Sequence, residues 1–184
     1  MTAEQCQLLA LQRARRDSST APIPEYRVRI SADVFIPQKK IQPLGLKAEL
    51  NKISFRTGEK ATLEMKTNRN ARIAVFNLTA DDKVMMLFPN QWEKENLLPG
   101  GKSLSFPGPD SMTEMVMQTL PGHKRDPEAF MVVALDPHPD KDFLAFFPPA
   151  RPMPLSDFFK KYSETSESAE DAILTYEVVS APAP

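Results

Sequence analysis

Four potential metal ligands stand at every second position after an apolar run: Asp136, His138, Asp140 and Asp142. Carboxylate and imidazole groups both bind divalent metals, and the prolines between these residues would stiffen the loop that carries them. The segment lacks the spacing and the glycine turn of a calcium-binding loop. It therefore indicates either a metal site or, the interpretation we favour, an exposed acidic linker after an interior strand.

Nucleophilic catalysis needs a serine or cysteine held beside a base, and the sequence offers little toward one. The chain has two histidines, and His123 stands in a Pro-Gly-His-Lys stretch typical of a turn. No Gly-x-Ser-x-Gly elbow, P-loop or dinucleotide-binding glycine pattern occurs, and the one cysteine, Cys6, is near the N-terminus. We expect no catalytic residues, no cofactor and no enzymatic activity.

A second candidate site surrounds the only tryptophan, just after the step Leu-Phe-Pro-Asn at residues 87–90. Proline would stop a strand there, and Asn90 would cap the following loop, so the step itself is best interpreted as structural. The functional interpretation is a rim for a protein partner, because tryptophan is a common interface anchor. Its candidate residues are Asn90, Gln91, Trp92 and Asn96. The competing interpretation buries Trp92 under its own loop.

Methionine is unusually frequent in the predicted strands, at positions 85, 86, 112, 115, 117 and 131. Thioether side chains can form an adaptable binding surface, but they more often fill irregular gaps in a core. We therefore expect these methionines in the core.

Composition excludes several classes of function. The 23 basic and 24 acidic residues nearly balance, which gives no overall field to gather nucleic acid or anionic lipid. No run approaches the roughly 18 apolar residues of a membrane helix, and glutamines interrupt the leucines that a signal peptide would need. We expect a soluble chain without a membrane span that does not bind nucleic acid.

The elements that must position these residues are mostly strands. Alternating or continuously apolar stretches predict strands at residues 26–36, 46–55, 61–65, 71–78, 83–88, 103–106, 112–119, 129–135 and 173–179. The pattern changes phase near Asn51, which predicts a β-bulge, and residues 56–59 predict the turn of a hairpin. Residues 71–78 are apolar on both faces and are expected at the centre of a sheet, and 91–101 as a long polar loop.

Helical spacing appears near both ends of the chain. Residues 155–163 place Leu155, Phe158, Phe159 and Tyr162 on one face of a predicted C-terminal helix. Residues 1–24 predict a short helix or tail and a linker, 25–180 the β domain, and 181–184 a tail. We expect a mostly β fold: a single antiparallel β-sandwich, Ig-like in general shape, with the C-terminal helix packed against one edge.

Residues 46–135 resemble a known bacterial family. An aromatic residue and a Gly-Glu pair at 58–59 precede a strand, an aspartate turn, the Leu-Phe-Pro-Asn step, and an Asn-x-Leu loop at 96–98, in the order found in domain-of-unknown-function family 4384. The resemblance implies an accessory β domain, often attached to caspase-like peptidases, kinases or cell-envelope lipoproteins, and it implies no catalytic residues. This chain departs from the family at Asp81-Asp82-Lys83, where the usual step is Asp-Gly.

Three functions are therefore carried forward. The leading hypothesis is a non-enzymatic interaction or accessory module of a bacterial envelope or secretion-associated assembly, with a protein partner. The alternatives are a small-ligand or metal-binding sensor that uses the loop from Asp136 to Asp142, and an intracellular regulatory domain for a partner enzyme. The resemblance implies a periplasmic or envelope location, and a cytoplasmic one fits the third hypothesis.

Overall fold

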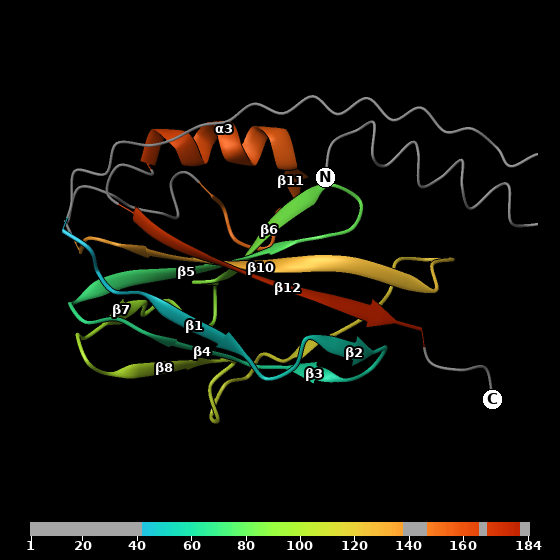
Figure 1. Cartoon of the computed structure of the whole chain (residues 1–184), viewed down its shortest axis with the longest axis horizontal. Helices are drawn as coiled ribbons and strands as arrows, with labels where there is room; N and C mark the ends of the chain where they lie inside the picture. The colour runs from blue at the N-terminus through green and yellow to red at the C-terminus, as the bar shows by residue number, and fades with distance from the viewer. Residues whose placement is uncertain (1–41, 138–146, 166–168, 181–184) are drawn as a thin grey trace, which may run out of the picture. The chain divides into compact units, whose positions relative to one another are not determined.

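The computed structural model describes residues 42–137, 147–165 and 169–180. Their regular secondary structure is mainly β-strand, together with one described helix (Figure 1). The predicted N-terminal helix, the predicted strand at 26–36, the domain boundary at residue 25 and the C-terminal tail fall outside the described residues.

A seven-stranded sheet forms the middle of the described structure. Its main path follows the order β11-β6-β5-β10-β12-β2, and β7 pairs with β5 beside it. The strands are β2 (Ser54–Arg56), β5 (Ala71–Leu78), β6 (Lys83–Phe88), β7 (Leu97–Leu98), β10 (Arg125–Leu135), β11 (Met153–Pro154) and β12 (Ala169–Val179). The central position predicted for residues 71–78 is confirmed, because β5 lies between β6 and β10.

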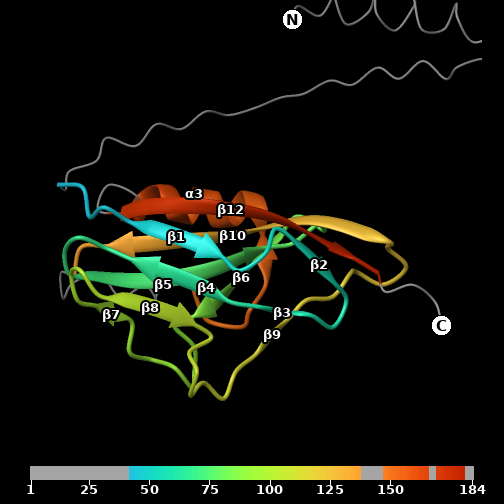
Figure 2. The ribbon, with the colours of Figure 1, turned by 60° about the horizontal axis from the view of Figure 1, so that its bottom comes forward.

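Two smaller sheets lie on one side of this large sheet (Figure 2). In the first, β4 (Leu63–Lys66) pairs antiparallel with both β1 (Lys47–Leu50) and β8 (Ser103–Phe106). The predicted alternation is confirmed in β4, where Leu63 and Met65 are buried while Glu64 and Lys66 are exposed. The second consists of β3 (Lys60–Ala61) and β9 (Met115–Val116).

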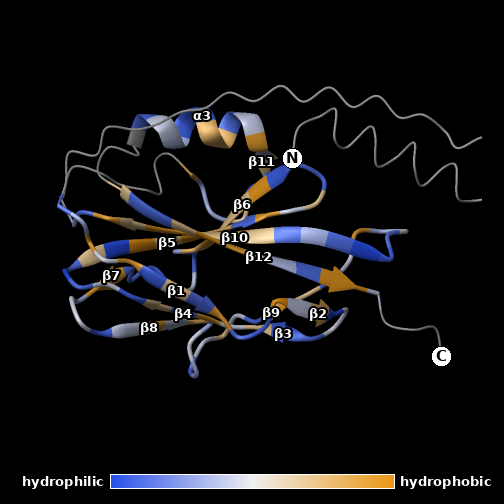
Figure 3. Cartoon of the chain, viewed as in Figure 1, coloured by the Kyte–Doolittle hydropathy of each residue, from blue (hydrophilic) through white to orange (hydrophobic). Residues whose placement is uncertain are grey.

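The large sheet is apolar on both faces and therefore takes part in two cores. One core joins it to the smaller sheets and contains Phe55, Ile73 and Phe130 together with Leu63 and Phe106. The other lies under the helix α3 (Leu155–Thr165). The apolar residues concentrate in the middle strands, and β10 changes from hydrophilic at its start to hydrophobic toward its end (Figure 3).

The helix covers a face of the large sheet, so the prediction that it packs against an edge is wrong. Phe158 is fully buried, and its ring centroid lies 4.9 Å from that of Phe76 on β5. The reason is that β5, β6 and β10 carry apolar side chains on the face turned away from the small sheets, and these need cover from water. Phe159, the next residue, is 41% exposed.

The chain changes sheets at Asn51, where a bulge was predicted. Before this residue β1 pairs with β4, whereas after it β2 pairs with β12 in the large sheet. The prediction of a bulge is therefore wrong, because the change of phase marks a change of sheet. The β2–β12 pair is also parallel, with Phe55 opposite Val178, which corrects the expectation of a purely antiparallel fold.

The turn predicted at residues 56–59 is present, but it does not close a hairpin. The Glu59 N–H donates to the Arg56 carbonyl at 3.0 Å, and Gly58 has a φ of +92°, which suits glycine. The flanking strands β2 and β3 belong to different sheets. By contrast, β5 and β6 pair antiparallel as a hairpin, with Asp82 in a left-handed conformation at a φ of +58°.

In two segments the observed structure differs in detail from the prediction. Of residues 112–119, only Met115 and Val116 form a strand, and the long loop predicted at 91–101 contains the short strand β7. The first of these short strands, β9, pairs with β3 in the two-stranded sheet, and the second, β7, pairs with β5 of the large sheet.

Candidate functional site

The loop after β6 is built around Asn90, which is 9% exposed. Its Oδ1 accepts hydrogen bonds from the N–H groups of Trp92, at 2.9 Å, and Glu93, at 2.8 Å. Its Nδ2 donates to the Leu87 carbonyl at 3.0 Å. Asn90 thus caps the loop as expected of the Leu-Phe-Pro-Asn step, because its side chain satisfies backbone groups that no strand pairs.

Asn96 ties the same loop to the large sheet. It is 6% exposed, its Nδ2 donates to the Ile73 carbonyl at 3.1 Å, and its Oδ1 accepts from Arg72 Nη1 at 3.0 Å. The predicted partner residues therefore divide into two kinds. Asn90 and Asn96 hold the loop, whereas Gln91 and Trp92 are exposed, Trp92 by 62%. The interpretation that buried Trp92 under its own loop is wrong.

A second loop, residues 107–114, is fastened to the first through Glu93. The Glu93 carboxylate accepts hydrogen bonds from the hydroxyls of Ser111 and Thr113, and these two hydroxyls lie 2.7 Å apart. Met112 stands between them and is 90% exposed. Two loops that are distant in sequence are thus joined, and each presents a large apolar side chain to solvent. We call Gln91, Trp92 and Met112 the loop surface.

The prediction that Met112 lies in the core with the other methionines is wrong, because its side chain is exposed. Met86, Met115, Met117 and Met131 are buried as expected. A signal existed in the spacing, because Met112 is three residues from Met115 and therefore falls on the opposite face of an extended chain.

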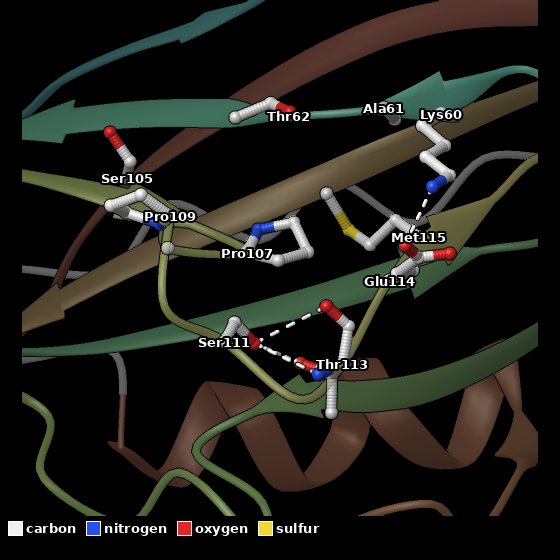
Figure 4. Close-up of a pocket in the computed structure, with 11 residues that line it drawn as sticks. Lys60, Ala61, Thr62, Ser105, Pro107, Pro109, Ser111, Thr113, Glu114 and Met115 are labelled. Atoms are coloured by element: carbon white, nitrogen blue, oxygen red, sulfur yellow. Dashed lines mark hydrogen bonds and ion pairs between the residues drawn. The ribbon is translucent and has the colours of Figure 1, made fainter.

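A cavity of about 480 Å³ lies beside the second loop. Figure 4 shows Lys60 reaching Glu114 on one side, Ser111 turned toward Thr113, and the rings of Pro107 and Pro109. The Lys60 Nζ lies 2.6 Å from Glu114 Oε1. The walls of this cavity thus offer hydroxyls, proline rings and an ion pair between Lys60 and Glu114.

A second cavity, of about 420 Å³, shares Glu114 and Met115 with the first but extends to the face of the large sheet. Tyr176 on β12, Glu128 on β10 and Asn77 on β5 line it. The Tyr176 hydroxyl lies 2.7 Å from both Glu128 Oε2 and Asn77 Oδ1. A hydroxyl has a single proton to donate, and the charged carboxylate is the stronger of these two acceptors.

The electrostatics of this cavity follow from burial. Removal from water raises the pKa of Glu128 above its ordinary value, against hydrogen bonds from Tyr176, Asn77 and the Ala80 N–H that lower it. Burial, followed by the charge of Glu128, also raises the pKa of Tyr176, so this phenol is neutral at physiological pH. The Tyr176 ring stacks on Phe130, with centroids 4.6 Å apart, which fixes the position of the hydroxyl.

His123 fastens the wall of the second cavity. As expected it is a turn residue, with its N–H donating to the Leu120 carbonyl, and its Nδ1 lies 2.6 Å from Oδ1 of Asp126. Asp126 is 1% exposed, and its Oδ2 accepts from the Leu120 N–H at 2.6 Å. Burial raises the pKa of Asp126, but these two hydrogen bonds outweigh it and bring the pKa below its ordinary value.

The predicted metal loop is described only at its start. Asp136 follows β10 and is partly exposed, whereas His138, Asp140 and Asp142 lie outside the described residues. Within residues 42–137, 147–165 and 169–180, no three or more histidine, cysteine or acidic side chains gather where they could hold a metal.

These observations define a class: a mostly β protein of several sheets, with a helix on one sheet face, two fastened loops and two adjoining cavities. Within it, the model of the family described as "domain of unknown function (DUF4384)" matches residues 54–126, which confirms the resemblance seen in the sequence. The matched segment runs from β2 to the start of β10 and includes both loops. No curated protein and no solved structure matches the chain. Among the described residues, no helix is long and apolar enough to cross a membrane.

Proposed function

We propose that this protein is a non-enzymatic interaction module that docks a protein partner on the loop surface. The observation that carries the proposal is the bridge from Glu93 to Ser111 and Thr113, which holds Trp92 and Met112 on two joined loops. Both side chains are mostly exposed, at 62% and 90%.

The physical argument concerns cost and gain on binding. The free energy falls when a partner covers a large apolar side chain that was exposed to water. Tryptophan and methionine are enriched at interfaces. Binding also costs entropy when loops must become ordered. Loops already fixed by Asn90, Asn96 and Glu93 avoid most of that cost.

The setting of the module is part of the same proposal. An accessory role in a bacterial envelope or secretion-associated assembly rests on the resemblance to the DUF4384 family. We also propose that the architecture is a variant of an Ig-like sandwich. The core shared by the large sheet and the β1-β4-β8 sheet supports this, and the helix layer and the parallel β2–β12 pair are its departures.

The test is capture of partners by the full chain from envelope and soluble fractions of its source, followed by affinity measurement with the purified partner. Trp92→Ala and Met112→Ala are compared with Ile53→Ala, because Ile53 is also a large exposed apolar residue, at 77%, but lies outside the loop surface. We expect each loop variant to weaken binding about tenfold or more, as hot-spot residues do.

Circular dichroism would establish that all three variants keep the fold of the parent. Equal binding by the loop variants and the Ile53→Ala control would contradict the proposal, as would the absence of any partner whose capture depends on Trp92.

A further inference from the structure

The second cavity contains a carboxylate, Glu128, that has no counter-charge among the residues the structure describes. Glu128 accepts from the Tyr176 hydroxyl at 2.7 Å, and among the described residues no lysine, arginine or histidine forms an ion pair with it. The other carboxylate of the cavity, Glu114, is paired with Lys60 at 2.6 Å. The described residues that line the cavity include no basic side chain.

An ionised carboxylate partly removed from water is stabilised by a nearby cation. A carboxylate can accept about four hydrogen bonds, so Glu128 keeps acceptor capacity beyond those from its neighbours. A ligand that brings a positive charge and N–H donors would satisfy both needs. An anionic ligand would be repelled by Glu128, because the charge of Glu114 is already balanced by Lys60.

The other residues that line the cavity indicate the character and size of the rest of the ligand. Met85, Leu87, Met117 and Phe130 line the cavity with apolar surface. Thioether side chains adapt to the shape of what they contact. A volume of about 420 Å³ suits a small molecule or a single side chain.

We propose that the second cavity binds, at Glu128, a primary ammonium group carried on a short apolar chain. The ammonium pairs with Glu128 beside the Tyr176 hydroxyl, and the chain lies along the methionines and Phe130. This chemistry is shared by free alkylamines and by a lysine side chain of a protein. The proposal concerns a different site from the loop surface and does not depend on it.

The experiment uses the full chain and three probes of equal length: hexylammonium, 1-hexanol and hexanoate. Binding is measured by calorimetry at pH 7 and located by two-dimensional NMR. We expect hexylammonium to bind about tenfold or more tightly than 1-hexanol, because a hydrogen bond to a charged group is stronger than one between neutral groups. We expect no binding of hexanoate.

Two variants separate the charge from the shape of the site. Glu128→Gln keeps the volume and the acceptor for Tyr176 but removes the charge, so the preference for hexylammonium over 1-hexanol should disappear. Glu64→Gln is the matched control, because Glu64 is exposed on β4 and is not a lining residue. It should keep the preference of the parent.

Equal affinity for hexylammonium and 1-hexanol in the parent, or an unchanged preference in Glu128→Gln, would overturn the proposal. Should Glu128→Gln fail to fold, NMR of the parent decides alone: shifts caused by hexylammonium must include Glu128, Thr79 and Gln118, and shifts confined elsewhere overturn it. A short peptide with one lysine distinguishes the sources. Tighter binding of the peptide than of hexylammonium supports the site with a protein lysine, and the reverse order supports it with a free amine.

Discussion

Asn90 stands where β6 stops pairing, and its side chain takes the place of missing strand partners for three backbone groups. Loss of such a buried group leaves donors and an acceptor without partners. We therefore expect Asn90→Ala to lower the free energy of unfolding by about 1–3 kcal/mol. Urea denaturation measures this.

The control for this change is the neighbouring residue. Gln91→Ala alters an exposed side chain in the same loop, and we expect a change within about 0.5 kcal/mol. Similar losses in both variants would show that Asn90 does not cap the loop in solution.

Glu128 gives a prediction on pH. Burial raises its pKa in the folded state above the ordinary value of 4.5, so its contribution to stability is full below that value and is lost as the pH rises through the raised pKa. Glu128→Gln removes the charge at every pH. We expect this variant to be more stable than the parent at pH 7 and equal to it near pH 4, about where both carry a neutral group.

Thermal unfolding at a series of pH values measures the difference, with Glu64→Gln as the exposed control. A Glu128→Gln variant that is less stable at pH 7 than the parent would mean that the charge of Glu128 is stabilised in the fold.

The helix α3 shows how one element depends on the sheet beneath it. Phe158 is fully buried among aromatic rings, including Phe76 and Phe147. Removing a buried aromatic ring from a packed core costs about 3–5 kcal/mol, so Phe158→Ala should lower the free energy of unfolding by that amount. Phe159→Ala, at a position that is 41% exposed, should cost less than about 1.5 kcal/mol.

Chemical denaturation of the two variants makes this comparison within one helix turn. Equal losses would mean that the helix does not present Phe158 to the face of the sheet.

The hydrogen bonds through Glu93 that join the two loops also give a testable prediction. Thr113 N–H donates to Ser111 Oγ at 3.0 Å, and Ser111 in turn donates to Glu93. Glu93→Ala removes the acceptor that holds Ser111, so hydrogen exchange of the Thr113 N–H should accelerate about fivefold or more. Glu95→Ala is the control, because that carboxylate accepts from Leu97 within its own loop. Unchanged exchange in Glu93→Ala would show that the loops are held by other contacts.

At the scale of the whole molecule, the segment that matches the family model lacks two strands that contribute to the shared core. Residues 54–126 end at the start of β10 and exclude β12. Those two strands contribute Phe130, Val132, Tyr176 and Val178 to the core shared by the sheets, and β12 is the strand with which β2 pairs. A fragment without them would leave much of that core in water.

We therefore expect residues 42–180 to unfold cooperatively in urea and residues 42–124, which lack both β10 and β12, to show no cooperative transition. Since β5 would lose one neighbour and β2 its partner, the shorter fragment should also bind a hydrophobic dye. A sigmoidal transition in the shorter fragment would contradict this view of the core.

Local pattern was sufficient for the elements whose environment can be read from their own residues. Continuous apolarity predicted β5 between two strands, alternation predicted β4, and residues 103–106 were predicted as the strand that forms β8. Helical spacing likewise predicted α3 and its buried Phe158. The cluster around Trp92 was found from residue types alone.

Tertiary structure decided which sheet each strand joins and which cluster members reach solvent. Alternation shows which face of a strand is buried but not the strand beside it, so the change of sheet at Asn51 looked like a bulge. The same limit hid the joining of Glu93 to Ser111, across 18 residues, and of Tyr176 to Glu128, across 48. Partners in a sheet are chosen by contacts that are distant in sequence, and only the folded chain brings these side chains together.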